Sequence, residues 1–95
     1  MSGANRRAHA ITRITNKRGL HARASAKFVE AVAHYTCEVT VTKDGTSVSG
    51  RSIMGLMMLG AGRGSTVELL ATGSDAQEAM RELLDLIQSK FHEDQ

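Results

Sequence analysis

Alternating apolar and polar residues predict four β-strands along the chain. The clearest covers residues 38–43, where Val39 and Val41 fall on one face. Asp44 and Gly45 follow it and favour a two-residue hairpin turn, because both turn positions require a positive φ. The predicted strands span residues 9–15, 38–43, 46–49 and 66–72.

Three segments with apolar residues at helical spacing alternate with these strands. Residues 22–33 are rich in helix formers and carry a narrow stripe of small residues that we expect to be buried. A short apolar helix follows Ser52, a suitable N-cap, and ends near residue 59. The third begins at Asp75, with Glu78 three residues later as a capping pattern. The first helix should bury Ala22, Ala26, Val29 and Ala33, and the last Ala76, Ala79, Met80, Leu83, Leu84, Ile87 and Phe91.

The order strand, helix, strand, strand, helix, strand, helix predicts an α+β fold. With short connections, the economical arrangement is an open-faced β-sandwich, a four-stranded antiparallel sheet covered on one face by three helices. The 95 residues, 41% of them hydrophobic, suffice for one domain with one modest core. We therefore expect a flexible tail at residues 1–8 and a single domain at residues 9–95.

Composition and charge exclude several classes of protein. The net charge of +2 is too small to indicate a nucleic-acid or membrane partner. No run of about 18 apolar residues occurs, so no membrane span is expected. Cys37 is the single cysteine, which rules out an internal disulfide and a cysteine-based metal site. We expect Cys37 to be a small buried residue and the protein to be cytoplasmic.

A glycine-rich loop at residues 60–64 superficially resembles a phosphate-binding loop. Such loops follow a strand and open a helix, whereas this one follows a predicted helix and opens a strand. Aromatic residues make up only 3% of the chain, so no stacking platform for nucleic-acid bases is present. A nucleic-acid-binding module is therefore disfavoured.

His21 is the principal candidate for chemistry. It lies between Gly19 and the first helical residue, at a helix N-terminus whose unpaired N–H groups favour an anion. Arg23 can add guanidinium donors, and a neutral imidazole is a competent nucleophile. An ordinary polar cap is the alternative, and position alone favours it.

The other three histidines have no comparable setting. His9 falls in a strand, His34 at a helix end and His92 near the C-terminus, so we interpret all three as structural or incidental. We find no carboxylate pair and no nucleophile–base–acid set beyond His21. An enzyme, a metal site and a bound cofactor are therefore not expected.

Two segments carry a family resemblance. Residues 14–29, ITNKRGLHARASAKFV, resemble the active-site segment of HPr, the histidine-containing phosphocarrier of the bacterial phosphotransferase system. Residues 52–61, SIMGLMMLGA, resemble the second signature of that family. The sequence around His21 resembles the nitrogen-type branch of the family, and some Gram-positive sugar-type members, more than the enteric sugar carrier.

The resemblance implies a carrier that is a substrate and product of its partners. The residue matching His21 is phosphorylated on Nδ1 by enzyme I, which draws on phosphoenolpyruvate, and the group then passes to a IIA-type component. The residue matching Arg23 accompanies the phosphohistidine. Ala24 departs from the proline that many members have there, although alanine also suits the first turn of a helix.

The second signature adds a modification site and a docking surface. In the family, the residue matching Ser52 is the target of HPr kinase/phosphorylase where that enzyme exists; an ordinary N-cap is the alternative. A short helix on a sheet buries one face only, so some of its apolar side chains must be exposed, although at least two should fill the core. By resemblance, the docking residues are Leu20, Ile53, Met54 and Met57.

One competing function stays open at this point. A regulatory protein could bind partners through the methionine-rich helix, under control of Ser52 phosphorylation, without obligatory phosphoryl transfer. His21 beside Arg23 argues for the carrier, since a purely regulatory protein does not need that pair. We expect a monomer in either case.

Overall fold

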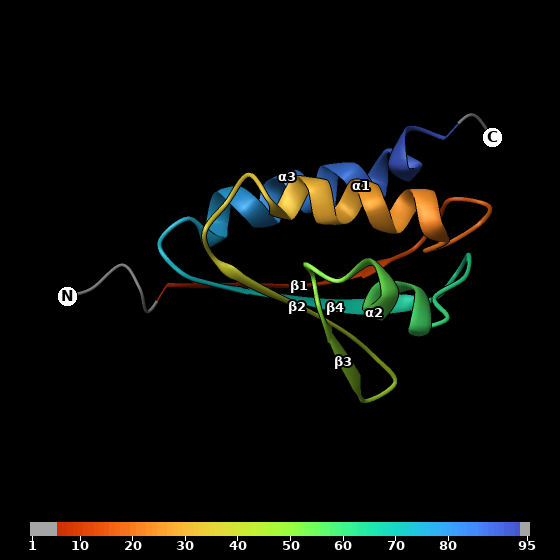
Figure 1. Cartoon of the computed structure of the whole chain (residues 1–95), viewed down its shortest axis with the longest axis horizontal. Helices are drawn as coiled ribbons and strands as arrows, with labels where there is room; N and C mark the ends of the chain where they lie inside the picture. Colours follow the sequence, from red (N-terminus) through yellow and green to blue (C-terminus); the bar gives the residue numbers. More distant parts are fainter. Residues whose placement is uncertain (1–5, 94–95) are drawn as a thin grey trace.

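Four antiparallel strands form one sheet in the order β1-β4-β2-β3, and helices cover one of its faces (Figure 1). The computed structural model describes residues 6–93. The strands are β1 (Arg7–Arg13), β2 (Glu38–Lys43), β3 (Thr46–Ser49) and β4 (Thr66–Thr72). The helices are α1 (Ala22–Val32), α2 (Ile53–Met58), α3 (Ala76–Gln88) and a short 3-10 turn, η2 (Lys90–His92). The predicted fold class and order of elements are confirmed.

The register of the sheet places one apolar row beneath the helices. Val39 of β2 pairs with Ala71 of β4, and Val41 pairs with Leu69. All four side chains are buried, as period-two alternation predicts. Asp44 (φ 51°) and Gly45 (φ 82°) both have positive φ, so the predicted hairpin turn is confirmed.

The sheet begins earlier than the sequence suggests. Arg7 and Ala8 belong to β1, where Ala8 pairs with Ala71 and is 7% exposed. The expectation of a flexible tail through residue 8 is therefore corrected, because pairing with β4 outweighs the polar character of the segment. Residues 1–5 of that expected tail lie outside the described residues.

The buried face of α1 differs from the predicted stripe of small residues. Ala22 and Ala33 are exposed, and Ala26 and Val29 are only partly buried. The buried residues are Ala24, Ser25, Phe28, Ala31 and Val32. The face is rotated because burying the ring of Phe28 gains more free energy than burying a row of methyl groups.

Asp75 stands at the start of α3, but it does not cap the helix. Its carboxylate accepts hydrogen bonds from the backbone amides of Thr36 (2.8 Å) and Cys37 (2.9 Å). These bonds, that of Thr36 first, hold the pKa of the Asp75 carboxyl below its usual value. The predicted capping pattern is thus wrong, and Asp75 instead ties α3 to the residues before β2. Cys37 is buried, as expected.

The last helix ends before Phe91, which reaches the core by another route. α3 ends at Gln88, and Lys90, Phe91 and His92 follow with φ of 60°, 56° and 59°. Phe91 lies within this left-handed turn and is completely buried. It brings Glu93 to the start of α1, at the right of the view in Figure 1.

Candidate functional site

The loop before α1 fixes the position of His21. Gly19 has a φ of +67°, and a Cβ there would lie 2.4 Å from the carbonyl oxygen of Ala61. Only glycine fits that backbone and that space. The Leu20 amide donates to the same oxygen of Ala61 at 2.9 Å, so the chain enters α1 along a fixed path.

His21 is the N-cap of α1, as predicted. Its backbone is extended (φ −76°, ψ −177°), and its carbonyl accepts from the Ser25 amide at 2.8 Å. The His21 side chain makes no capping hydrogen bond. The amides of residues 22–24 therefore have no acceptor within the helix, and they present the positive end of its dipole beside the ring.

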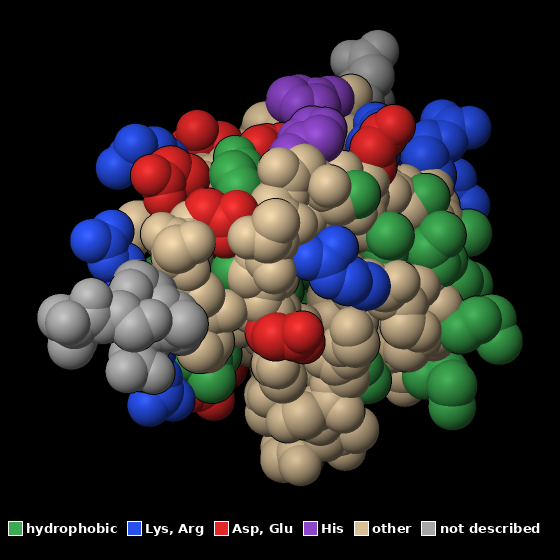
Figure 2. Space-filling view, turned by 60° about the vertical axis from the view of Figure 1, so that its left-hand side comes forward, with side chains coloured by type: hydrophobic (Ala, Val, Ile, Leu, Met, Phe, Trp, Pro, Cys, Tyr) green, Lys and Arg blue, Asp and Glu red, His purple; other side chains and the backbone are tan. Residues whose placement is uncertain are grey.

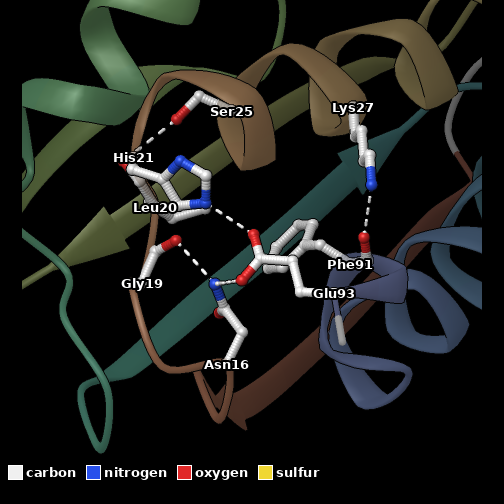
Figure 3. A network of polar contacts seen from close by, with 8 residues as sticks. All are labelled: Asn16, Gly19, Leu20, His21, Ser25, Lys27, Phe91 and Glu93. Atoms are coloured by element: carbon white, nitrogen blue, oxygen red, sulfur yellow. Dashed lines mark hydrogen bonds and ion pairs between the residues drawn. The ribbon is translucent and has the colours of Figure 1, made fainter. Parts of the chain in front are cut away.

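The sequence analysis missed two residues here: Glu93, which contacts the ring, and Asn16, which contacts Glu93. The carboxylate of Glu93 lies 2.5 Å from His21 Nε2, and the two side chains are only 12% and 16% exposed (Figure 3). Asn16 Nδ2 donates to Glu93 Oε1 at 3.1 Å and to the Gly19 carbonyl at 2.8 Å. Glu93 is 72 residues from His21, and nothing in its local sequence indicates the contact.

Further bonds secure the two segments that meet here. Ser25 is fully buried, and its hydroxyl donates to the Leu20 carbonyl at 3.1 Å. Lys27 Nζ donates to the Phe91 carbonyl at 2.6 Å, which joins α1 to the C-terminal turn (Figure 3). The loop before α1 and the segment after α3 are therefore held together at His21.

A shallow basic hollow of about 540 Å³ opens beside the ring. Its lining brings His21 and Arg23 together, as predicted, and adds residues that the sequence analysis did not connect with them. These are Lys17, Arg18, Lys27, His92 and Glu93. Four permanent cations around one carboxylate favour the binding of an anionic group such as phosphate.

The methionine-rich helix presents an apolar surface, which we call the α2 patch. It consists of exposed Ile53 (40%), Met54 (69%), Met57 (41%) and Met58 (78%). Apolar side chains gather at the right edge of Figure 2, in the region of α2. Only Leu56 of this helix is buried, so the expectation that at least two of its apolar residues fill the core is wrong.

Leu20 and Ser52 occupy less open positions. Leu20 is only 6% exposed and packs in the core, so its side chain offers little surface for docking. Ser52 is half-buried, and its hydroxyl caps α2 by accepting from the Gly55 amide at 2.9 Å.

The described residues show neither a metal site nor a membrane span. Over residues 6–93, no group of three or more potential metal ligands comes together. In the same range no helix has the length and apolar character to cross a bilayer.

Comparison with known proteins matches nearly the whole described chain. Residues 9–89 match the family described as the PTS HPr component phosphorylation site. A phosphocarrier protein HPr of Neisseria meningitidis is 54% identical over 80 residues, covering 84% of this chain and 90% of its own. That of Cupriavidus necator is 51% identical over 82 residues, covering 86% and 92%. The crystal structure of an HPr from Thermoanaerobacter tengcongensis superposes with a TM-score of 0.89 at 43% identity, covering 93% of this chain and 99% of its own.

Proposed function

The chain belongs to the HPr family of phosphocarrier proteins of the phosphotransferase system, and on that premise we propose that His21 accepts a phosphoryl group from enzyme I on Nδ1 and passes it to a IIA-type component. The protein acts in this way as a carrier and not as an enzyme. The proposal takes it to be a cytoplasmic monomer. A single observation carries it: His21 lies at the N-cap of α1 with Nε2 bonded to Glu93 and Nδ1 without a hydrogen bond from the described residues.

The chemistry requires one nucleophile and a place for negative charge. The lone pair of Nδ1 attacks phosphorus, and the N–P bond forms as the bond between phosphorus and the donor's leaving group breaks. The amides at the start of α1 and the guanidinium of Arg23 face the oxygens of the transferred group. Transfer to the acceptor runs the same step in reverse, so the ring must be reachable by two partners in turn.

The α2 patch is proposed as the surface on which both partners dock. Flexible thioether side chains adapt to more than one partner, which suits a carrier that alternates between donor and acceptor. Ile53, Met54 and Met57 supply the contact area, and Leu20 supports the loop behind His21. α2 packs on α1, so a partner on this patch lies close to the ring.

Ser52 is proposed as a regulatory phosphorylation site, with HPr kinase/phosphorylase as the enzyme. A phosphate at a helix N-cap is compatible with the helix dipole, so α2 should persist. The modification would add about two negative charges beside the α2 patch. An acidic partner would then be repelled from it.

Phosphorylation in vitro tests the proposal. The chain is incubated with enzyme I and phosphoenolpyruvate, and intact-mass spectrometry then measures the addition of one acid-labile phosphoryl group. We expect His21→Ala to abolish the addition and His34→Ala, a change at an exposed histidine beyond the other end of α1, to leave it intact. Labelling that persisted in His21→Ala would refute the proposal.

A further inference from the structure

The contact between His21 and Glu93 determines which ring nitrogen carries a hydrogen. Glu93 Oε2 lies 2.5 Å from Nε2. An ionised carboxylate can only accept, and a neutral imidazole has one donor and one acceptor nitrogen. Nε2 must therefore carry the hydrogen, and the lone pair of the neutral ring lies on Nδ1.

The surroundings of the ring favour the ionised form of Glu93. The charged and titratable groups that line the hollow with His21 are Lys17, Arg18, Arg23, Lys27 and His92, together with Glu93 itself. Within the described residues, Glu93 is the single carboxylate of this lining. Nearby cations stabilise a carboxylate, and this one also accepts a hydrogen bond from Asn16.

Asn16 sets the orientation of the carboxylate. Its side chain is fully buried, and Nδ2 donates to two oxygens, the Gly19 carbonyl and Glu93 Oε1. A flipped amide would place an acceptor against both, so the orientation is unambiguous. Oδ1 is buried and has no hydrogen-bond partner among residues 6–93, so the hydrogen bonds that this side chain makes there are those of Nδ2.

The path of the chain after α3 points to the same role. Lys90, Phe91 and His92 adopt three consecutive left-handed conformations, which non-glycine residues avoid. Such strain persists where surroundings enforce it, and here the burial of Phe91 and its bond from Lys27 do so. As a result, the carboxylate of Glu93 lies next to Nε2 of His21.

We propose that Glu93, oriented by Asn16, is a positioning residue that holds neutral His21 in the Nε2–H tautomer and thereby reserves Nδ1 for phosphoryl transfer. This inference rests on the proposed function. In this proposal Glu93 contacts neither the donor nor the acceptor of the phosphoryl group, and it acts only through the imidazole ring of His21. A carboxylate that fixes the tautomer of a catalytic imidazole is a known physical device.

Glu93→Gln tests the inference sharply. The Gln side chain must turn its oxygen to Asn16 Nδ2, because Asn16 cannot flip, and its amide NH₂ then faces Nε2 as a donor. The ring is driven to the Nδ1–H tautomer, in which the nucleophilic lone pair is lost. We expect ¹⁵N shifts of His21, measured where the ring is neutral, to change from Nε2–H to Nδ1–H, and phosphorylation by enzyme I to slow by about tenfold or more.

Two further variants separate tautomer from structure. Glu93→Ala removes the acceptor without adding a donor, and its shifts should be those of a mixture of tautomers. Glu82→Gln is the matched control: Glu82 accepts from His34 Nδ1 at 3.1 Å, so this change should alter His34 and leave the shifts of His21 unchanged. Backbone amide spectra confirm that each variant is folded.

The two proposals fail in different ways. A wild-type His21 with its hydrogen on Nδ1, or a Glu93→Gln variant that keeps the Nε2–H form and the wild-type rate, overturns the positioning role. If wild-type His21 is in the Nε2–H form but enzyme I does not phosphorylate the protein, the proposed function is overturned. The tautomer would then have no role in phosphoryl transfer.

Discussion

At His21, the two nitrogens of one ring meet different surroundings. Nε2 is bonded to Glu93, in a contact that is largely closed to solvent. Nδ1 has no hydrogen bond from the described residues, and the ring lies at the positive end of the α1 dipole. An asymmetry between two chemically similar atoms is what a carrier needs, because transfer in both directions must use the same nitrogen.

Arg23 should matter for rate and not for stability. Its exposed guanidinium lines the hollow beside His21, and each charge-assisted hydrogen bond to phosphate contributes about 1.5–3 kcal/mol. Arg23→Ala should therefore slow phosphorylation by about tenfold or more, with little change in unfolding free energy. Stopped-flow or quench-flow transfer measurements check this. Arg81→Ala, at an exposed position on α3, is the control; an equal loss in both variants would contradict a specific role of Arg23.

Gly19 should matter for stability. Gly19→Ala forces a Cβ against the Ala61 carbonyl at a positive φ, and we expect a loss of about 3 kcal/mol or more in unfolding free energy. Gly62, on the facing loop, has nothing within 4 Å of a built Cβ, so Gly62→Ala should change stability by no more than about 1 kcal/mol. Urea denaturation compares the two. Equal stabilities would show that the close approach at Gly19 is not required.

The site was only half predictable from the sequence. His21 and Arg23 are local, since a glycine, a helix start and a cation adjoin in the chain. Glu93 is not, because its contact depends on a left-handed turn of three non-glycine residues, for which no sequence pattern exists. The sequence around Asn16 indicates only a turn. The hydrogen bond from its side-chain amide to Glu93 is visible only in the folded structure.

At the scale of elements, α2 is short and leaves most of its apolar side chains exposed. Met54→Asp places a charge in the α2 patch and should weaken binding of enzyme I by about 2 kcal/mol, the cost typical of a central interface residue. The matched control is Ile11→Asp, at an apolar position of β1 that is 66% exposed, away from α2. Calorimetric titration compares them. Equal affinities for the two variants would contradict docking on α2.

The junction of α3 with β2 predicts a dependence of stability on pH. Because its folded pKa is lowered, Asp75 stabilises the fold above the pKa of the unfolded chain, and that contribution is lost as the pH falls through the folded value. Asp75→Asn should therefore be less stable than wild type near neutral pH, with a smaller further loss on acidification below about pH 4. Thermal melts across pH 3–7 measure this. Parallel curves for the two proteins would exclude the linkage.

The sequence predicts secondary structure well where hydrophobic periodicity is strong. It predicts poorly where a single tertiary contact sets the end of an element or its buried face. β2, β3 and β4 lie at the expected residues, since alternation and the Asp44–Gly45 turn are local signals. The start of β1 and the buried face of α1 differ because strand pairing with β4 and the burial of Phe28 are tertiary effects. The end of α3 differs for the same reason, at Phe91.

At the scale of the molecule, the fold gathers the site at one end of the helical layer. The start of α1, the loop before it and the described C-terminal residues meet there, and α2 packs on α1 (Figure 1). One face of the sheet is left without helices. His21 is 16% exposed and lines the basic hollow at this end, so the proposed donor and acceptor must approach the ring through that opening.

The identity of the phosphorylated atom decides whether His21 Nδ1 is the carrier atom. The chain, labelled with ¹⁵N-histidine, is treated with enzyme I and phosphoenolpyruvate and observed by ³¹P and ¹⁵N NMR. We predict one phosphoryl group, coupled through one bond to Nδ1 of His21. A phosphoryl group on Nε2 of that ring, or on His9, His34 or His92, would contradict it.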